Sequence, residues 1–475
     1  MTALSERLLI ATLAWGAFAF GAVYPWAYWP LAAAGAGLGA HALYRTRGWR
    51  DPRVRTLGLG LAAIAAAIAM QMVSLPYSLV QRLSPALDRF FYEYALSYHP
   101  ASLHSLSLSS SSTVVVFALF VAFAVMFLGL LSAIGGRSLE WLMVQLLGLG
   151  LALAIVGIVQ KAFPMDTARP LVYGFWEPRQ GGSPFGPFIN RNHFAGWMLM
   201  ALPLVAGYSC AVVAQAWNVR ERGFNSVMRW FTTVEANRFA HLGFSALLMG
   251  TALVLTRSRS GMASFAIAVA AFALLAMREF KGRRSRVMVA VYMSLILLGA
   301  VAWAGTDDTV GRFLQAKSDS SGRIGAWKDT LRIVSDFPSF GTGMGTYGQA
   351  MLIYQTESRP VMYVQAHNDY LQILAEGGAI VAVPVAVTVG LIMAGLWRRL
   401  KPGADDVLTR WVRIGAVSGL AGIAAQSAIE FSLQMPGNTA LFAVLLAIAL
   451  HRGRPPSDSS REHRRASSSA HAYRV

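Results

Sequence analysis

The chain has 475 residues, of which 55% are hydrophobic and 13% are charged. Soluble domains carry roughly a quarter charged residues, so this sparse charge excludes an ordinary soluble protein of this size. The net charge of +18 is not accompanied by an RNA- or DNA-binding signature, which argues against a nucleic-acid-binding protein. A single cysteine, Cys210, excludes any intrachain disulfide.

Long apolar segments predict helices that cross a membrane. The run 113–135, for example, has about the length that spans a hydrocarbon core. The first apolar run lacks a convincing cleavage site and is therefore interpreted as a retained helix. We predict an all-α fold, a polytopic transmembrane helical bundle with about 12 spans. The predicted spans are 7–23, 26–43, 56–73, 113–134, 138–162, 193–217, 241–256, 261–277, 287–304, 373–397, 411–429 and 438–451.

Basic residues give this bundle a predicted orientation, because Lys and Arg gather on the cytoplasmic side of membrane proteins. They gather here in 44–55, 220–238, 278–286, 398–410 and the tail, which places both termini in the cytoplasm. The predicted outer segments are 74–112, 164–192, 257–260, 305–370 and 430–437. The chain then divides into N-terminal transmembrane helices (1–304), one large and partly helical outer loop (305–370), C-terminal transmembrane helices (371–451) and a disordered basic tail (452–475).

The stretch GGSPFGPFINRNHFAGWM, residues 181–198, combines an irregular loop with the start of a span. Arg191, Asn192 and His193 meet at this border. Asn192 or His193 could cap the following helix, and Arg191 could extend to phospholipid headgroups. This stretch alone therefore does not require a functional site.

The turn LTRSRSGM, residues 255–262, places Arg257 and Arg259 between two apolar spans. An arginine close to hydrocarbon is costly unless it meets water, an anion or a carboxylate. Two arginines on the outer side also run against the positive-inside rule, which favours a functional over a topogenic interpretation. Both residues are candidates for binding an anion.

Residues 321–351 form a third polar stretch. Its segment GRIGAWKDTLRIV has helical spacing, with Ile324, Trp327, Leu331 and Val334 on one stripe and Arg323 near its start. The GTGMG run that follows looks like a dinucleotide fingerprint, but no strand-rich βαβ unit surrounds it. The glycines are instead predicted to let the backbone turn or pack tightly.

The stretch VQAHNDYL, residues 364–371, lies just before a long apolar run. His367 could cap the following helix or be a buried, hydrogen-bonded histidine, and Asn368 and Asp369 could simply cap that helix. A neutral imidazole can also take a proton from an attacking hydroxyl near neutral pH, and arginine forks match phosphate oxygens. One histidine with several arginines on the same side therefore suits a transfer reaction that releases a diphosphate.

With these residues in hand, the chain resembles the O-antigen ligase and Wzy-type O-antigen polymerase family of bacterial membrane proteins. The motifs that carry the resemblance stand in the family's order over roughly 180–450, whereas the first 150 residues agree mainly as apolar spans. These motifs read FINRNHFAGWM, TRSRSG, GRIGAWKDTL, FPSFGTGMGTYG, AHNDYLQILAEGG and IEFSLQMPGNTALFAVLL.

The resemblance implies transfer of a glycan from a polyprenyl (undecaprenyl)-diphosphate donor to an acceptor hydroxyl. The reaction would take place on the periplasmic face of the bacterial inner membrane, so that the large outer loop becomes a periplasmic loop. The general base of the family corresponds to His367. The diphosphate-binding arginines correspond to Arg259 and Arg323, with Arg191 and Arg257 as further candidates.

Other polar residues of these motifs are supporting candidates: Asn192, His193, Asn368 and Asp369. The family pattern often has aspartate where Glu430 stands, which weakens the case for a role of Glu430 although a carboxylate is retained. No cofactor and no metal site are predicted, because Asp307 and Asp308 form the one acidic pair on the outer side.

Two alternatives stay open at this point. A polymerase and a ligase share the donor chemistry, and the motifs only slightly favour a polymerase in O-antigen or exopolysaccharide assembly. The acceptor would accordingly be a glycan, lipid A core or a protein. A transporter or flippase of lipid-linked saccharides is the second function, with the arginines lining a passage, although no internal repeat supports it.

Overall fold

The predicted apolar segments fold as α-helices in the computed structural model. It describes residues 2–95, 98–99, 101, 103–163, 171–178, 182–216, 232–279, 309–356, 362–401 and 405–453. The helices there are α1 (Ala3–Phe18), α2 (Pro25–Thr46), α3 (Pro52–Gln71), α4 (Tyr77–Leu83), α5 (Pro85–Tyr94), α6 (Ser110–Ala133), α7 (Gly136–Ala162), α8 (Arg191–Ala216), α10 (Val234–Leu255), α11 (Arg259–Met277), α13 (Thr309–Asp336), α14 (Tyr347–Tyr354), α15 (Asp369–Arg399), α16 (Val407–Gln426) and α17 (Pro436–Leu450). Two two-residue strands, β1 (Leu75–Pro76) and β2 (Leu103–His104), pair antiparallel.

The all-α, polytopic membrane fold is confirmed. Eight helices of the described residues are long and apolar enough to cross a membrane: α3, α6, α7, α8, α10, α11, α15 and α16. The predicted spans 7–23, 26–43 and 438–451 are also helical, but α17 is shorter and α1 and α2 are not among the eight. The predicted span 287–304 lies outside the described residues.

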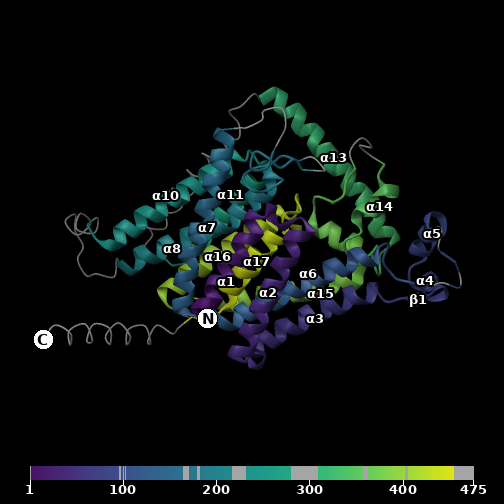
Figure 1. Ribbon diagram of the computed structural model, residues 1–475, viewed down its shortest axis with the longest axis horizontal. Coiled ribbons are helices and arrows are strands. Elements are labelled where there is room, and N and C mark those ends of the chain that lie inside the picture. The colour runs from purple at the N-terminus through teal and green to yellow at the C-terminus, as the bar shows by residue number, and fades with distance from the viewer. Residues whose placement is uncertain are drawn as a thin grey trace.

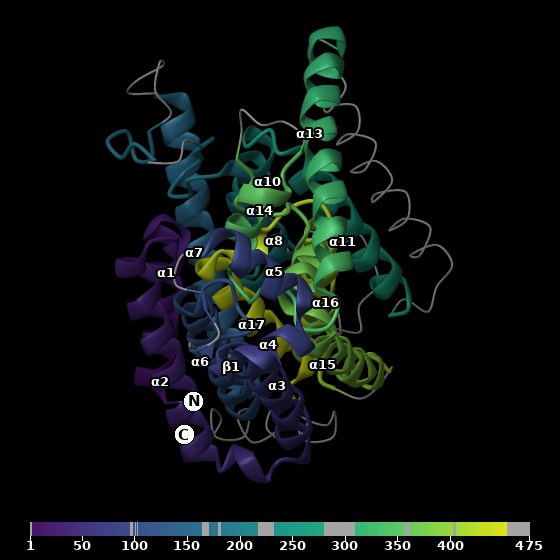
Figure 2. The same cartoon turned by 90° about the vertical axis from the view of Figure 1, so that its right-hand side faces the viewer.

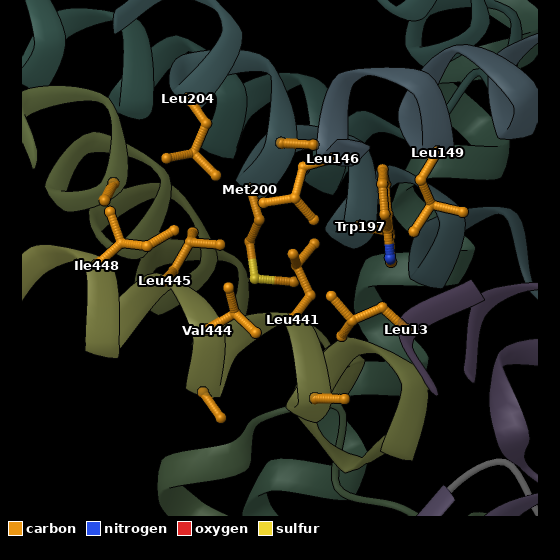
Figure 3. Packing of buried hydrophobic residues seen from close by; sticks show 14 of the residues in the cluster. Leu13, Leu146, Leu149, Trp197, Met200, Leu204, Leu441, Val444, Leu445 and Ile448 are labelled. Atoms are coloured by element: carbon orange, nitrogen blue, oxygen red, sulfur yellow. The ribbon is translucent and has the colours of Figure 1, made fainter. Parts of the chain in front are cut away.

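The largest core surrounds α17, which contacts α1, α6, α8 and α16. Nearly every residue of α17 is buried, so this apolar helix packs against other parts of the protein on nearly all sides. Figure 3 shows Leu441, Val444 and Leu445 of α17 packing near Trp197 and Met200 of α8. This buried helix fixes the chain that immediately precedes it, residues 427–435.

The central helices α8 and α16 approach each other closely through glycines. A Cβ atom on Gly207 would overlap the carbonyl oxygen of Trp411, and one on Gly415 would overlap the carbonyl oxygen of Pro203. Small residues allow membrane helices to come this close without a polar contact. The beginning of α8 and the end of α16, where polar residues gather, are therefore held in one arrangement.

The predicted outer loop contains α13 and α14 and has a second, smaller core. Ile333 of α13, Phe337 just after that helix and Met351 of α14 pack there with Val80 of α4 and Leu87 of α5. In Figures 1 and 2, α13 projects from the rest of the molecule, and α4 and α5 lie beside α14. Segments 74–112 and 305–370, which were predicted on the same side of the membrane, thus contact each other through this core.

The predicted helix in 322–334 is confirmed within α13, but its buried face differs from the predicted stripe. Ile324 and Leu331 are 48% and 54% exposed. The buried side is formed by Ala326, Ile333 and Phe337 instead. Trp327 and Val334 of the stripe are half-buried, so only part of the stripe turns toward the second core.

The GTGMG run makes the tight backbone packing that was predicted for it. Gly341 and Gly343 have φ values of +68° and +102°, which favour glycine. The loop crosses α15 at Gly378, itself at φ +55°, and a Cβ atom on Gly341 or Gly378 would overlap the other segment's backbone. The side chain of Glu376 accepts hydrogen bonds from the backbone nitrogens of Gly345 (3.0 Å) and Tyr347 (2.8 Å).

A buried ion pair with further hydrogen bonds joins the beginning of α16 to the end of α17. Arg413 is 1% exposed and contacts the carboxylate of Asp405, and it donates to the carbonyl oxygens of Ala449 (2.8 Å) and His451 (2.8 Å). The five donors of a guanidinium allow one side chain to satisfy several carbonyls at a helix end. The beginning of α16 is thereby held to the end of α17, at the far end of both helices from the segment 427–435 that connects them.

Candidate active site

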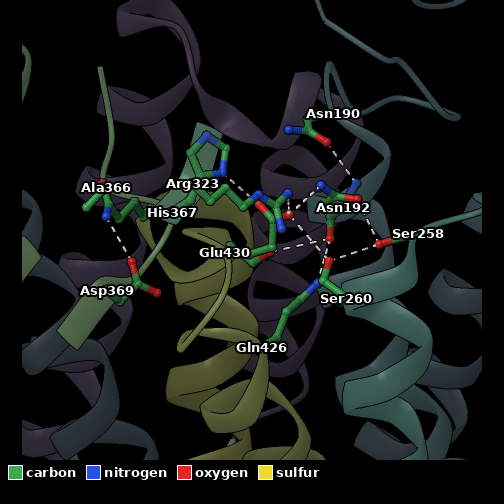
Figure 4. Close-up of polar contacts among 12 residues, drawn as sticks. Asn190, Asn192, Ser258, Ser260, Arg323, Ala366, His367, Asp369, Gln426 and Glu430 are labelled. Atoms are coloured by element: carbon green, nitrogen blue, oxygen red, sulfur yellow. Dashed lines mark hydrogen bonds and ion pairs between the residues drawn. The ribbon is translucent and has the colours of Figure 1, made fainter. Parts of the chain in front are cut away.

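Glu430 is the centre of a polar cluster in the connection between α16 and α17. It is fully buried, and its backbone nitrogen donates to the carbonyl oxygen of Gln426. Its Oε1 accepts from Arg323 (2.5 Å), from the Asn192 side chain (2.6 Å) and, more weakly, from the Ser260 hydroxyl (3.4 Å). Figure 4 shows these side chains converging on Glu430 from separate elements.

The other carboxylate oxygen of Glu430 holds a histidine. His367 Nδ1 lies 3.2 Å from Glu430 Oε2. Because an ionised carboxylate only accepts hydrogen bonds, Nδ1 carries a proton in this contact, and the neutral tautomer that fits it has its lone pair on Nε2. The side chain of His367 is 24% exposed, so the ring is held by a buried group and is still reachable from outside the cluster.

Electrostatics keeps Glu430 ionised. Burial alone would raise its pKa, but the hydrogen bond from His367 and the charge of Arg323 outweigh burial and lower the pKa below its ordinary value. The stability that these contacts add is therefore present above the unfolded-state pKa of a glutamate. It is lost as the pH falls through the lowered pKa of the folded state.

The backbone at His367 is in an uncommon conformation. Its φ is +49°, in the left-handed region that non-glycine residues rarely adopt. The ring packs edge-on against Phe431, the residue after Glu430, with ring centroids 4.8 Å apart. A non-glycine residue in this region costs of order 1 kcal/mol, which the surrounding contacts must offset.

The RSRS turn contributes its serines to the cluster. Ser258 caps α11, because its Oγ accepts from the backbone nitrogen of Gly261 (3.0 Å). The same hydroxyl donates to Oδ1 of Asn192 (2.7 Å), while Ser260 reaches Glu430. Asn192 thus receives one hydrogen bond from α11 and donates another to the central carboxylate.

The arginines of the same turn are exposed and make no hydrogen bond or ion pair with this cluster. Arg257 and Arg259 are exposed, whereas Ser258 and Ser260, which alternate with them, are buried. Neither arginine forms an ion pair with a carboxylate of the described residues. Arg257 also has a left-handed backbone, with φ +53°. The predicted anion-binding residues are therefore adjacent to the cluster in the chain but do not contact His367 or Glu430 in this structure.

The beginning of α8 supplies the remaining predicted residues. The Asn190 side chain accepts from the backbone nitrogen of Asn192 (2.9 Å), and the Asn192 carbonyl oxygen accepts from Gln426 (3.1 Å). His193 is 5% exposed and contacts the ring of Phe431, with centroids 4.7 Å apart. Arg191 is the first residue of α8, and its side chain is exposed.

Asn368 caps the following helix, as its structural alternative predicted, whereas the side chain of Asp369 does not act as a cap. Asn368 caps α15, with its side chain accepting from the backbone nitrogens of Tyr370 (3.1 Å) and Leu371 (3.1 Å). Asp369 is buried and accepts from Gln434 Nε2 (2.8 Å). Neither side chain reaches Glu430, and both fix the chain that follows His367.

Sequence reasoning missed the central residue. Glu430 was not predicted as a site residue. In the RSRS turn, the candidates were Arg257 and Arg259 and not Ser258 and Ser260. The one sequence signal was a carboxylate in a short outer segment between two apolar spans, where an ionised group needs partners. The residues that meet here come from four segments that were predicted on the outer side, namely 164–192, 257–260, 305–370 and 430–437.

Fold and site together define a class of protein: a multi-pass membrane protein with an arginine and an oriented histidine on one buried carboxylate. Residues 244–386 match the family model described as O-antigen ligase, which confirms the predicted resemblance to the O-antigen ligase and Wzy polymerase family. The match includes Ser258, Arg323 and His367 but ends before Glu430. This family suggests glycan transfer in O-antigen assembly. No curated protein matches the chain.

Proposed function

We propose that the protein transfers a glycan from a polyprenyl-diphosphate donor to an acceptor hydroxyl, with His367 as the general base. The observation that carries the proposal is that His367 Nδ1 lies 3.2 Å from the buried carboxylate of Glu430, while the side chain of His367 is 24% exposed. In a neutral imidazole bound in this way, the proton is on Nδ1 and the lone pair is on Nε2. A base needs a lone pair, a fixed orientation and a pKa near the working pH, and a neutral imidazole offers these.

The reaction then follows with its atoms balanced. Nε2 of His367 takes the proton of the acceptor hydroxyl as the acceptor oxygen bonds to the anomeric carbon of the donor sugar. The bond between that carbon and the diphosphate oxygen breaks, and the polyprenyl diphosphate leaves with the bonding electrons. Glu430 stabilises the imidazolium that forms, as the buried carboxylate does in a catalytic triad.

The leaving diphosphate needs positive charge. Arg257 and Arg259 are exposed and have no carboxylate partner among the described residues, so their charge is available to phosphate oxygens. Arg323 is ion-paired to Glu430 yet keeps further N–H donors, and its side chain is 31% exposed. We propose these three residues, with Arg191, as the diphosphate site, and Asn192 as the residue that holds Glu430 beside them.

The proposal extends to where and on what the protein acts. The site lies on the periplasmic face of the bacterial inner membrane, within reach of the loop 305–370, and both termini are cytoplasmic. The donor is an undecaprenyl-diphosphate-linked glycan, and the acceptor is a glycan, lipid A core or a protein. We favour a polymerase over a ligase and propose that the transfer is independent of metal.

Reconstitution tests this function directly. Purified protein in proteoliposomes is given a polyprenyl-diphosphate oligosaccharide and candidate acceptors in the presence of a chelator. We expect a longer or newly linked glycan, detected by mass spectrometry, with release of polyprenyl diphosphate. Movement of the donor across the bilayer with no glycan product would contradict the proposal and support the transporter.

The Arg259→Ala variant tests the diphosphate site. Hydrogen bonds to charged groups contribute roughly 1.5–3 kcal/mol, so we expect kcat/KM for the donor to fall about ten- to a hundredfold. Arg259→Lys should retain part of the activity, since it keeps the charge but not the fork. Arg398→Ala, which removes an exposed arginine at the far end of α15, is the matched control. Equal kinetics for Arg259→Ala and Arg398→Ala would remove Arg259 from the site.

A further inference from the structure

The peptide group just before His367 is held from two sides. Ala366 is fully buried, and its backbone nitrogen donates to the Gln372 side chain (2.9 Å). Its carbonyl oxygen accepts from the indole nitrogen of Trp327 (3.0 Å). Buried backbone groups need such partners, but a side-chain partner from a distant helix also fixes the plane of the peptide.

The chain just after His367 is equally fixed. Asn368 caps α15, and the backbone nitrogen of Asp369 donates to the carbonyl oxygen of Ser427 (2.8 Å). His367 therefore connects two anchored segments, and its left-handed φ of +49° is the conformation that joins them. Without the anchor at Ala366, the residue is free to relax toward the extended conformations that histidine favours.

Trp327 lies one helical turn after Arg323, so both side chains project from the same side of α13. Arg323 contacts Glu430, and Trp327 contacts the backbone that carries His367. One helix, α13, thus positions both Arg323, which pairs with Glu430, and the backbone that carries His367. Their relative placement decides whether Nδ1 of His367 meets the carboxylate.

We infer that Trp327 is a positioning residue, whose indole N–H holds the Ala366 peptide and so keeps His367 Nδ1 against Glu430. The inference rests on the proposed function, because it assigns to Trp327 the orientation of the general base. Trp327 touches no reacting atom. Loss of its hydrogen bond reduces the fraction of protein in which His367 is oriented for proton transfer.

The Trp327→Phe variant tests this inference, because it keeps an aromatic ring and removes the N–H donor. We expect kcat to fall about three- to tenfold, the effect of one hydrogen bond, while KM for the donor stays within about twofold. Trp15→Phe is a matched control: the Trp15 indole nitrogen also donates to a backbone carbonyl, that of Ala27 (2.8 Å), within the α1–α2 region. Both variants should shift the melting temperature similarly.

Three results are informative. A Trp327→Phe kcat equal to that of Trp15→Phe would overturn the inference. A rise in KM for the donor with unchanged kcat would also overturn it, because Trp327 would then act in substrate binding. Loss of kcat in Trp327→Phe alone supports it. Full activity of His367→Ala would instead reject the proposed base, and the two failures are therefore distinguishable.

Discussion

Glu430→Gln is expected to lower kcat about 10²- to 10⁴-fold, the range for loss of an orienting carboxylate behind a catalytic histidine. The amide is nearly the same size, but it has one donor end and no charge. It can present its NH₂ group to His367 Nδ1, which favours the tautomer with the proton on Nε2. That tautomer cannot accept the proton of the acceptor hydroxyl, and the imidazolium also loses its counter-charge.

The measurement is the initial rate of glycan transfer in proteoliposomes at saturating donor. Glu430→Asp keeps the charge and should retain more activity than Glu430→Gln. Glu140→Gln is the matched control, because Glu140 is 52% exposed and its distance to Arg238 is 3.9 Å. A fully active Glu430→Gln enzyme with unchanged donor KM would show that His367 does not depend on this carboxylate.

His367→Ala is expected to lower kcat by a similar factor, about 10²- to 10⁴-fold, the usual contribution of general base catalysis. Binding of the donor should change little, because the proposed contacts to the diphosphate come from arginines. Added imidazole should restore part of the rate, since it can occupy the space that the deleted ring leaves. The two variants combined should lose little more than either alone, because they act as one unit.

A histidine remote from the cluster provides the comparison. His241 is exposed on α10 and its Nδ1 lies 2.7 Å from the carbonyl oxygen of Asn237, so His241→Ala should be fully active. Donor KM, kcat and protein abundance are measured for each variant. Equal turnover by His367→Ala and His241→Ala would assign proton transfer to another group.

Much of the fold could be predicted from composition alone. Apolar runs of sufficient length must form helices in a membrane because their backbone groups have no water to bond. The cap at Asn368 and the tight turns at Gly341 and Gly343 could also be predicted. They depend on side-chain chemistry and backbone freedom within a few residues of the chain. The orientation and the domain divisions stay predictions.

The centre of the site could not be predicted because it depends on contacts between distant segments. Glu430 meets Asn192, Arg323 and His367, which lie 238, 107 and 63 residues away in the chain. Nothing near Glu430 in the sequence marks it as buried. Likewise, only the structure shows that Ser260 faces the carboxylate and that Arg259, its neighbour, is exposed.

The backbone crossing of Gly341 and Gly378 affects how genetic screens of this protein should be interpreted. Alanine at either position would force two main chains apart, so polysaccharide output would fall as it does for a catalytic lesion. A screen that scores only the polymer would therefore group these glycines with His367. Scoring the amount of protein in the membrane alongside the polymer separates the two groups, because a chain that cannot close this crossing is degraded, whereas an inactive enzyme accumulates.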